Sequence, residues 1–566
     1  MGLNPLTKVE VAPADGSAPA HVRSIDVVVV GAGFSGLYML YRLRGIGFTA
    51  CGYEAGEGVG GTWYWNRYPG ARCDVESMDY SYSFSDELQQ EWHWTERYAA
   101  QPEILKYANH VADRFDLRKS IQFGTRVTAA LFDERQSRWL VETDRGDRVL
   151  ARFCIMATGC LSEAQVPVIT GRESFTGKWY HTGSWPHEGV DFTGRRVGII
   201  GTGSSAIQSI PIIAQQAAHL TVFQRTPNYS MPARNAPLDP AYERQVKQGY
   251  AEFRRQARES RVGFVTERSG EAALAVPEVE RLREYEKRWS RGGLGIGATY
   301  GDLLLSRDAN DTVAEFFRAK IRTIVRDPKV AQALLPTDYP FGTKRLCVDT
   351  CYYDTFNREN VTLVDLRKTP IERITPGGLR TSDTDYGLDD LVFATGFDAM
   401  TGALLKIDIC GRGGRRIQDA WAEGPRSYLG LSVAGFPNFF TITGPGSPSV
   451  LSNMIVSIEQ HVDWVADCLV YLRQAHHASI EATPEAQATW VQHVNDVGNM
   501  TLYPLAKSWY MGANVPGKPS VFMPYIGGVG VYRQKCDEVA AKGYEGFTFS
   551  GLESDSQGRV SKGRAR

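Results

Sequence analysis

Apolar residues recur along this chain in two patterns, as short runs of strand length and as longer segments with helical spacing. The runs at 25–30 and 197–200 each lead directly into a glycine-rich turn that is followed by a helix-like segment. Between 232 and about 340 the pattern changes to charged segments with helical spacing, such as 250–261 and 311–327, and strand signals become few. A strand–turn–helix unit is therefore predicted to begin twice, with a helical insertion after the second beginning.

Two further apolar runs, 154–157 and 391–394, end on Thr158-Gly159 and Thr395-Gly396. We interpret both Thr-Gly pairs as points where the chain crosses between domains, so that the C-terminal part completes the first domain. The predicted fold class is α/β, with two Rossmann-like dinucleotide-binding domains. The predicted boundaries are a flexible N-terminus at 1–23, a first domain in two parts at 24–159 and 397–553, a second domain in two parts at 160–231 and 341–396, the helical insertion at 232–340 and a flexible tail at 554–566.

Composition narrows the class of protein without naming a function. The chain of 566 residues has 63 Lys and Arg against 64 Asp and Glu, a balance that argues against nucleic-acid binding. No apolar stretch approaches the roughly 20 residues of a membrane helix, and the N-terminus does not resemble a signal peptide. Nine cysteines without a C-x-x-C pair favour a reducing compartment, and the ten histidines show no paired ligand motif. We expect a cytoplasmic monomer or weak homo-oligomer without membrane or metal.

The first glycine-rich turn predicts a nucleotide site. Gly31-Ala-Gly33-Phe-Ser35-Gly36 follows a β-branched strand and opens a helix, so that backbone amides face a pyrophosphate. Glu54 ends the next apolar run, where a carboxylate can accept the ribose hydroxyls. Such a turn can also simply pack a helix on a sheet, but the acid after it favours the nucleotide. The hydroxyl and aromatic residues at 60–70 suit a flat isoalloxazine, which indicates FAD.

The second turn, at 201–206, predicts a nicotinamide nucleotide. Alanine replaces the third glycine of the motif, a change that the motif tolerates. The strand after it ends in Arg225 instead of an acid, which suits a 2′-phosphate and favours NADPH over NADH, although a lone arginine is often only a solvated charge. A disulfide reductase would need a cysteine pair beside the flavin, and neither the widely spaced Cys51 and Cys73 nor the distant Cys347-x-x-x-Cys351 supplies one.

A longer motif links the chain to a known family. Residues 175–186 match the pattern F-x-G-x-x-x-H-x-x-x-W-P at Phe175, Gly177, His181, Trp185 and Pro186. This fingerprint resembles that of the type I Baeyer-Villiger monooxygenases, which are class B flavoprotein monooxygenases. Segments 61–74 and 341–345 are similar to two further motifs of the family, and the resemblance spans about residues 25 to 550. The segments 72–77, 223–225 and 444–448 are most similar to the phenylacetone and steroid monooxygenase subgroups.

The resemblance implies a reaction. NADPH would reduce FAD, O2 would add at the flavin C4a carbon, and the peroxide would attack a ketone to give an ester or lactone. Arg345 would stabilise the anionic species because a guanidinium does not give up its proton, and Asp74 would hold that arginine in place. His181 is expected to act at a hinge between domains and not as a general base. Sulfide or amine oxygenation by the same fold is the alternative enzyme, and a flavoprotein that leaks electrons to O2 is the alternative class.

The resemblance also assigns candidate residues to each ligand. An N-cap role for Asp74, a surface ion pair for Arg345 and core packing for Trp509 remain the structural alternatives. The expected FAD contacts are Gly31, Gly33, Ser35, Gly36, Glu54, Thr62, Trp63, Tyr64, Trp65, Asp74, Tyr80, Val127 and Met454. The expected NADP contacts are Arg72, Gly201, Thr202, Gly203, Ser204, Ser205, Gln208, Arg225, Thr226, Lys344, Arg345 and Trp509. The expected pocket for an aryl, cyclic or steroidal ketone is formed by Ser449, Val450, Leu451 and Met454.

Overall fold

The computed structural model describes residues 8–10 and 21–551, and the tail predicted at 554–566 lies outside them. Residues 1–7 and 11–20 of the predicted flexible N-terminus also lie outside the described residues. In the described part, β1 (Lys8–Glu10) pairs antiparallel with β2 (His21–Val30), with Val9 opposite Val22. β2 therefore begins before the apolar run at 25–30, and its first residues pair with β1.

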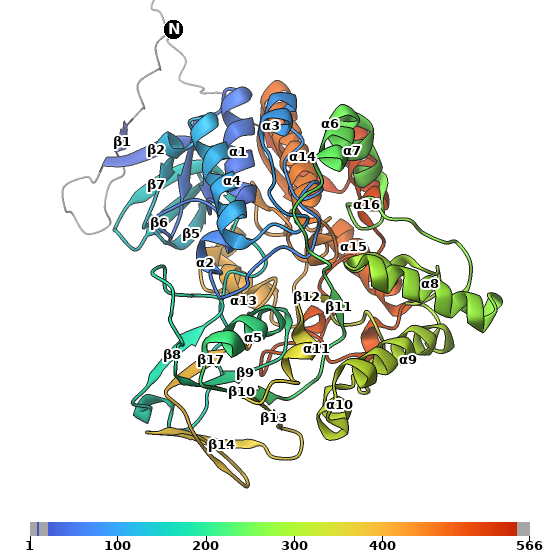
Figure 1. The fold of residues 1–566 in the computed structure, drawn as a ribbon. Coiled ribbons are helices and arrows are strands. Elements are labelled where there is room, and N and C mark those ends of the chain that lie inside the picture. Colours follow the sequence, from blue (N-terminus) through green and yellow to red (C-terminus); the bar gives the residue numbers. More distant parts are fainter. Residues whose placement is uncertain (1–7, 11–20, 552–566) are drawn as a thin grey trace, which may run out of the picture.

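A larger sheet forms the upper half of the molecule in Figure 1. Its strand order is β18-β5-β6-β7-β2-β3-β4, with β1 paired to β2 and β19 to β7. The strands β2, β3, β4, β7 and β19 run parallel, whereas β6 is antiparallel to both β5 and β7. The remaining bounds are β3 Ala50–Tyr53, β4 Ile121–Gln122, β5 Val127–Asp133, β6 Arg138–Thr143, β7 Arg148–Met156, β18 Asp408–Cys410 and β19 Phe439–Thr441.

Helices far apart in sequence cover one face of this sheet. Figure 1 shows α1 (Phe34–Gly45) beside α14 (Met454–Gln474), with α4 (Gln101–Arg114) on its other side. Alternate residues of β2 enter two cores, since Val27 and Val29 pack under these helices while Val28 and Val30 pack against the opposite face. A strand buried on both faces is an apolar run without polar alternation, which is the signal seen in the sequence. The C-terminal part adds β20 (His477–Ala482), α15 (Pro484–Asn499), α16 (Val529–Ala541) and β21 (Phe547–Gly551).

A smaller sheet lies below the larger one. Its five strands are all parallel, in the order β13-β10-β9-β17-β8, and α5 (Ser204–Gln216) packs on one face. The strand bounds are β8 Lys178–His181, β9 Arg196–Ile200, β10 His219–Gln224, β13 Val361–Asp365 and β17 Asp390–Phe393. An antiparallel three-stranded ribbon, β14 (Ile371–Thr375), β15 (Gly378–Thr381) and β16 (Asp385–Gly387), extends from it at the bottom of Figure 1.

The chain passes between the two sheets at both Thr-Gly pairs. After β7 it leaves the larger sheet at Gly159 and reaches β8, and after β17 it returns at Gly396 to β18. The two crossing segments pair with each other, because Gln165 N donates to Gly396 O at 2.9 Å and Ala164 bridges Phe397. Two adjacent segments of the chain therefore join the sheets.

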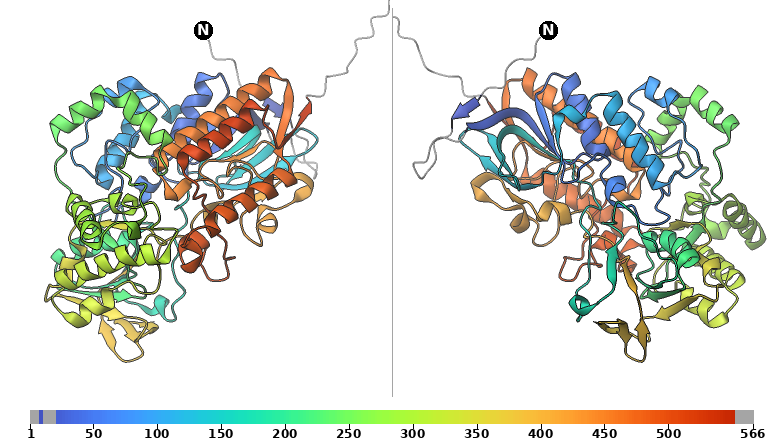
Figure 2. Two further views of the ribbon diagram at one scale, coloured as in Figure 1. Left: turned by 90° about the vertical axis from the view of Figure 1, so that its right-hand side faces the viewer. Right: turned by 60° about the vertical axis from the view of Figure 1, so that its left-hand side comes forward.

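The helical segment is present where the charged pattern placed it. It contains α6 (Pro240–Gln248), α7 (Tyr250–Glu259), α8 (Glu278–Arg291), α9 (Arg307–Ile324) and α10 (Pro328–Leu334), which lie at one side of both sheets in the views of Figures 1 and 2. Short parallel strands close the segment, since β11 (Ser230–Pro232) pairs with β12 (Cys347–Asp349). This pairing brings residues 341–346 back between the two sheets. Within the described residues, no helix is long and apolar enough to cross a membrane.

Candidate active site

The first glycine turn is closely packed and has no room for a side chain at Gly31 or Gly36. At Gly31, which has φ +106°, a Cβ would lie 2.6 Å from Ala157 O, and at Gly36 it would lie 1.9 Å from Gly31 O. Gly33 is the N-cap of α1, and no side chain caps the helix there. The turn therefore leaves the first amides of α1 available to an anion, as a pyrophosphate requires.

Glu54 stands at the end of β3, beside this turn. Its two carboxylate oxygens accept hydrogen bonds from Ala32 N and Gly56 N, each at 2.7 Å. Burial raises the pKa of the carboxyl group, and these backbone hydrogen bonds oppose the shift. Each oxygen keeps a second lone pair, so the group can still accept ribose hydroxyls.

The expected flavin segment, residues 60–70, packs against the first turn at Gly33. Thr62–Trp65 form α2, and a Cβ on Gly61 would lie 2.9 Å from Gly33 Cα. Trp63 is buried, and its Nε1 donates to the hydroxyl of Tyr80 at 3.1 Å. The turn, Glu54 and this aromatic segment therefore fit a dinucleotide that carries a flat ring.

The second turn repeats this geometry below α5. At Gly201, which has φ +111°, a Cβ would lie 2.4 Å from Ala394 O, whereas a Cβ on Gly203 would meet nothing within 4 Å. The Thr202 hydroxyl donates to Thr226 O at 2.8 Å and fixes the turn. Gly203 is the N-cap of α5 and makes no side-chain cap, and Ser204 and Ser205 begin the helix. Open space in front of uncapped amides fits a second pyrophosphate.

Two cations lie beside this turn. Burial, followed by repulsion from Arg225, lowers the pKa of Lys344 to about 8. The Lys344 Nζ lies 4.7 Å from the centre of the Tyr339 ring. Among the described residues, no carboxylate lies within 4 Å of either Lys344 Nζ or the Arg225 guanidinium. The arrangement fits a phosphate group that pairs with both cations.

This pKa predicts how NADP⁺ binding depends on pH. A phosphate next to Lys344 stabilises its charged form, so the bound pKa lies above the free value of about 8. The affinity for NADP⁺ that the charged Lys344 contributes is complete below the free pKa and is lost as the pH rises through it. We therefore expect NADP⁺ to bind about tenfold more weakly at pH 9 than at pH 7. Isothermal titration with NADP⁺ across this range measures the effect. Lys344→Arg should flatten the profile, and an equally steep profile in that variant would contradict the role.

Arg345 and Asp74 meet between the two turns. The guanidinium Nε and Nη2 of Arg345 donate to Asp74 Oδ2 at 3.1 and 3.0 Å. The Asp74 side chain is 3% exposed, whereas that of Arg345 is 35% exposed and reaches the space between the sheets. Burial raises the pKa of Asp74 and the guanidinium opposes the shift, while the carboxylate holds the pKa of Arg345 above its ordinary value against the penalty of burial. A fixed positive charge is thus oriented at the junction.

Gln208 of α5 joins this pair from the smaller sheet. Its amide Nε2 donates to Asp74 Oδ1 and Arg72 O, each at 3.1 Å. Its Oε1 accepts from the Tyr68 hydroxyl at 2.9 Å and from Arg72 N at 3.3 Å. We expected Gln208 and Arg72 at the nicotinamide nucleotide, and that contact stays a prediction. Within the chain, the Gln208 amide bonds to Tyr68, Arg72 and Asp74, and the Arg72 guanidinium pairs with Glu96 at 3.1 Å.

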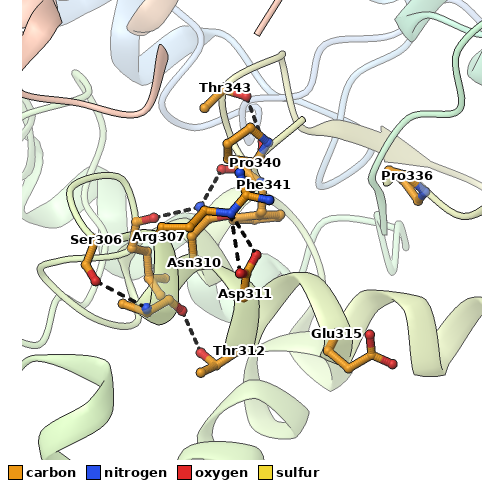
Figure 3. Close-up of polar contacts among 12 residues, drawn as sticks. Ser306, Arg307, Asn310, Asp311, Thr312, Glu315, Pro336, Pro340, Phe341 and Thr343 are labelled. Atoms are coloured by element: carbon orange, nitrogen blue, oxygen red, sulfur yellow. Dashed lines mark hydrogen bonds and ion pairs between the residues drawn. The ribbon is translucent and has the colours of Figure 1, made fainter. Parts of the chain in front are cut away.

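A buried asparagine holds the segment that carries Arg345. Figure 3 shows Asn310 of α9 between two backbone stretches: its Nδ2 donates to Leu303 O at 2.7 Å and Phe341 O at 2.9 Å, and its Oδ1 accepts from Phe341 N at 2.8 Å. Thr343 Oγ1 donates to Pro340 O at 2.7 Å and tightens the same turn. No sequence pattern indicated Asn310, because its partners are backbone atoms brought together by the fold.

Asn310→Leu tests this support. The change leaves two carbonyl groups and one amide without partners in a fully buried site, and we expect a loss of about 2 to 4 kcal/mol in the free energy of unfolding. Chemical denaturation measures it. The neighbouring Asp311→Ala removes only an exposed pair with Arg307, also drawn in Figure 3, and should change stability by less than about 0.5 kcal/mol. Equal losses in both variants would show that Asn310 has no special part.

The fingerprint lies at the crossings and not beside Arg345. His181 is buried, its Nδ1 accepts from Gly183 N at 2.9 Å, and its Nε2 lies 3.3 Å from Thr395 Oγ1. Burial lowers the pKa of His181 to about 4, so the ring is neutral near pH 7. Phe175 packs at the edge of the smaller sheet, and the Trp185 side chain packs in the core of that sheet. The backbone N of Trp185 donates to Trp65 O at 3.4 Å. These contacts fit a coupling element between the sheets.

One apolar cluster gathers the expected substrate residues. Val450, Leu451, Met454 and Trp509 pack together in it, and Ser449, at φ +42°, is buried beside them. The cluster also contains residues that the sequence did not indicate, namely Cys160, Met400, Tyr503, Tyr510, Phe522 and Met523. Cys160 Sγ lies 3.0 Å from Ser449 Oγ. Burial raises the pKa of Tyr510 to about 12, and the positive charge of Arg345 opposes this shift. An apolar wall therefore adjoins the oriented cation.

Known proteins of similar sequence were compared with the chain. Residues 28–289 match the family model described as pyridine nucleotide-disulphide oxidoreductase. All nine cysteines are free in the structure. A Baeyer-Villiger monooxygenase of Pseudooceanicola batsensis is 45% identical over 92% of this chain and 95% of that protein. A phenazine N-monooxygenase of Lysobacter antibioticus is 41% identical over 94% of this chain and 98% of that protein.

Solved structures are similar over the same length. Oxidised steroid monooxygenase bound to NADP is 56% identical, with a TM-score of 0.90 over 94% of this chain and 100% of that one. The OTEMO complex with FAD and NADP is 42% identical, with a TM-score of 0.90 over 93% of this chain and 99% of that one. Sequence and fold therefore agree along nearly the whole chain.

Proposed function

This chain belongs to the Baeyer-Villiger monooxygenases, and from that membership we propose that it uses FAD, NADPH and O2 to convert ketones into esters or lactones. The observation that carries the proposal is the Arg345–Asp74 pair, which lies between two dinucleotide turns and beside an apolar wall. When bound and reduced by NADPH, FAD would activate O2 for attack on a ketone carbonyl carbon.

Arg345 stabilises negative charge at the reacting oxygen. Its guanidinium stays protonated at neutral pH, so it neither quenches the nucleophile nor protonates the adduct. Asp74 fixes its orientation and compensates its charge, and Gln208 fixes Asp74 in turn. A charge oriented before the reaction needs no rearrangement during it, which is why such groups lower barriers. His181 moves no proton in this scheme, because it is neutral and bonded at the crossings.

We propose the following distribution of ligand contacts. The turn at Gly31, Gly33, Ser35 and Gly36, with Glu54, holds the FAD pyrophosphate and ribose, and Thr62–Trp65, Tyr80 and Met454 surround its flat ring. Val127 is a further FAD contact. The turn at Gly201–Ser205 holds the NADP pyrophosphate, with Arg225, Thr226 and Lys344 at the 2′-phosphate and Trp509 near the nicotinamide. The apolar cluster favours aryl, cyclic or steroidal ketones over polar ones.

The chain organisation is proposed as follows. The domain boundaries fall at 24–159 with 397–553 and at 160–231 with 341–396, and 232–340 forms the insertion, in accord with the two crossings. The nine free cysteines support a cytoplasmic location. We propose a monomer or weak homo-oligomer.

A ketone panel with isotope-labelled O2 tests the function. Purified protein with NADPH and an aryl, a cyclic or a steroidal ketone is expected to yield an ester or lactone that carries one labelled oxygen, as read by mass spectrometry. The panel should include an aryl sulfide and a phenazine, because one relative is a phenazine N-monooxygenase. Oxidation of the sulfide or phenazine without any ester or lactone would favour heteroatom oxygenation. NADPH consumption that yields only hydrogen peroxide would contradict both ketone oxygenation and heteroatom oxygenation.

A further inference from the structure

The loop at 508–521, here called the Trp509 loop, covers the apolar cluster. Trp509, Met511 and Val521 pack on the same group of residues as Met400 and Val450. Most of the loop has no regular structure apart from a single turn at Trp509–Met511. Turn hydrogen bonds such as Val515 N to Gly512 O and Lys518 N to Val515 O fold the loop on itself, so its attachment to the crossing depends on specific side-chain anchors.

Two polar side chains anchor the loop, and both reach the second crossing segment. Lys518 Nζ donates to Asp398 Oδ1 at 2.5 Å and to Ala399 O at 2.8 Å. Asn514 Nδ2 donates to Phe397 O at 2.7 Å. The Lys518 side chain is only 9% exposed and that of Asp398 is 23% exposed. An ammonium group that has lost most of its water is stable only while its carboxylate stays in place, so this pair is a strong constraint on the loop.

The same crossing segment contacts the fingerprint. The His181 Nε2 lies 3.3 Å from Thr395 Oγ1, and the His181 ring meets the Phe397 ring edge-on at 6.2 Å between centres. Gly183 is packed against Phe397 so closely that a Cβ would lie 2.6 Å from the ring. Residues 395–399 therefore touch the fingerprint on one side and the Trp509 loop on the other.

We propose that Lys518 is a positioning residue, and that its pair with Asp398, assisted by Asn514, latches the Trp509 loop onto the second crossing. The latch keeps Trp509 against the apolar cluster and transmits movement of the crossing to the loop. This inference rests on the proposed function, since it assigns to Trp509 the nicotinamide side of the site. Without the latch the loop opens, NADP⁺ leaves sooner and water reaches the flavin, so reducing equivalents from NADPH end as hydrogen peroxide.

The test uses the full chain loaded with FAD and the variants Lys518→Met, Asp398→Asn and Lys518→Arg. With NADP⁺ present, chymotrypsin should cleave the Trp509 loop about tenfold faster in the first two variants than in the parent. The dissociation constant of NADP⁺ should rise by about tenfold, and a larger share of the NADPH consumed should appear as hydrogen peroxide. Lys518→Arg keeps the charge and should restore most of the protection.

A matched control removes a lysine from an exposed pair. Lys542 pairs with Glu545 near the end of α16, with both side chains more than 60% exposed, and Lys542→Met should behave as the parent does. The double variant Lys518→Met/Asp398→Asn should cost no more than either single change, because both remove one interaction. Parent-like protection and NADP⁺ affinity in both single variants would overturn the latch. If Lys518→Met does not fold, Asp398→Asn and Lys518→Arg decide the question.

The readouts separate the latch from the function. Proteolysis and NADP⁺ binding need no ketone, so they report on the latch even if the parent oxidises none of the panel. Failure of the parent to form an ester or lactone would count against the proposed function alone. Equal cleavage in parent and variants, together with normal ester formation, would count against the latch alone.

Discussion

Replacing Arg345 with alanine is expected to lower ketone oxygenation by about 10²- to 10³-fold, which corresponds to about 3 to 4 kcal/mol in the barrier. The reason is that Arg345 is the oriented cation at the junction of the two turns, held by the two hydrogen bonds that it donates to Asp74. FAD content should stay normal because neither glycine turn depends on the guanidinium. Product formation by gas chromatography and FAD content by absorbance measure the two effects.

The control and the contrary result are both accessible. Arg380 forms exposed ion pairs with Glu372 and Asp385 in the outer ribbon, and Arg380→Ala should retain the parent rate. Arg345→Ala also leaves the Asp74 carboxylate buried without its cation, which is destabilising, so Arg345→Ala/Asp74→Asn should recover stability but not activity. Near-parent oxygenation by purified Arg345→Ala would remove Arg345 from the reaction.

Replacing Gly36 with alanine is expected to abolish FAD binding, with an affinity loss of more than about 100-fold. The new Cβ would lie 1.9 Å from Gly31 O, a distance that no real contact reaches, so α1 must move away from the turn that holds the pyrophosphate. The displacement separates the first helical amides from their anion. Titration of the deflavinated protein with FAD, followed by flavin fluorescence, measures the loss.

The same helix supplies the matched control. Gly45 ends α1, and a Cβ there would meet nothing within 4 Å. Gly45→Ala should bind FAD as the parent does and gain up to about 1 kcal/mol in stability, because alanine has the higher helix propensity. Equal FAD affinity in Gly36→Ala and Gly45→Ala would show that the first turn is not a pyrophosphate site.

The local parts of the site were predictable because each depends on residues close together in the chain. A β-branched strand, a glycine turn and an uncapped helix are written within a dozen residues, and both turns have the backbone that the sequence implied. The first glycine of each turn, Gly31 or Gly201, is required by a φ value above +100° and by a neighbouring carbonyl oxygen. The two crossings were visible for a similar reason, since each follows a buried strand and ends on a Thr-Gly pair.

The contacts between these parts could not be read in the same way. Asp74 and Arg345 stand 271 positions apart, and only the return of the chain at β12 brings them together. The Gln208 amide turns to the flavin segment because α5 packs against it, which its place in a nucleotide motif did not reveal. Asn310 and Lys518 bond to backbone carbonyls, and such partners leave no pattern in side chains. Ser449 is held at φ +42° by its buried surroundings, although serine alone does not favour that backbone.

The sequence by itself determined the two nucleotide turns, the helical insertion and the resemblance carried by the fingerprint, because local spacing fixes strands, turns and helix starts. The tertiary structure alone decided how Arg345 is oriented, what the fingerprint touches and how the Trp509 loop is anchored. Those features depend on how two sheets pack, and the larger sheet takes strands from both ends of the chain while the smaller one lies between them in sequence. No short segment contains both packed surfaces, so local spacing could not predict their contacts.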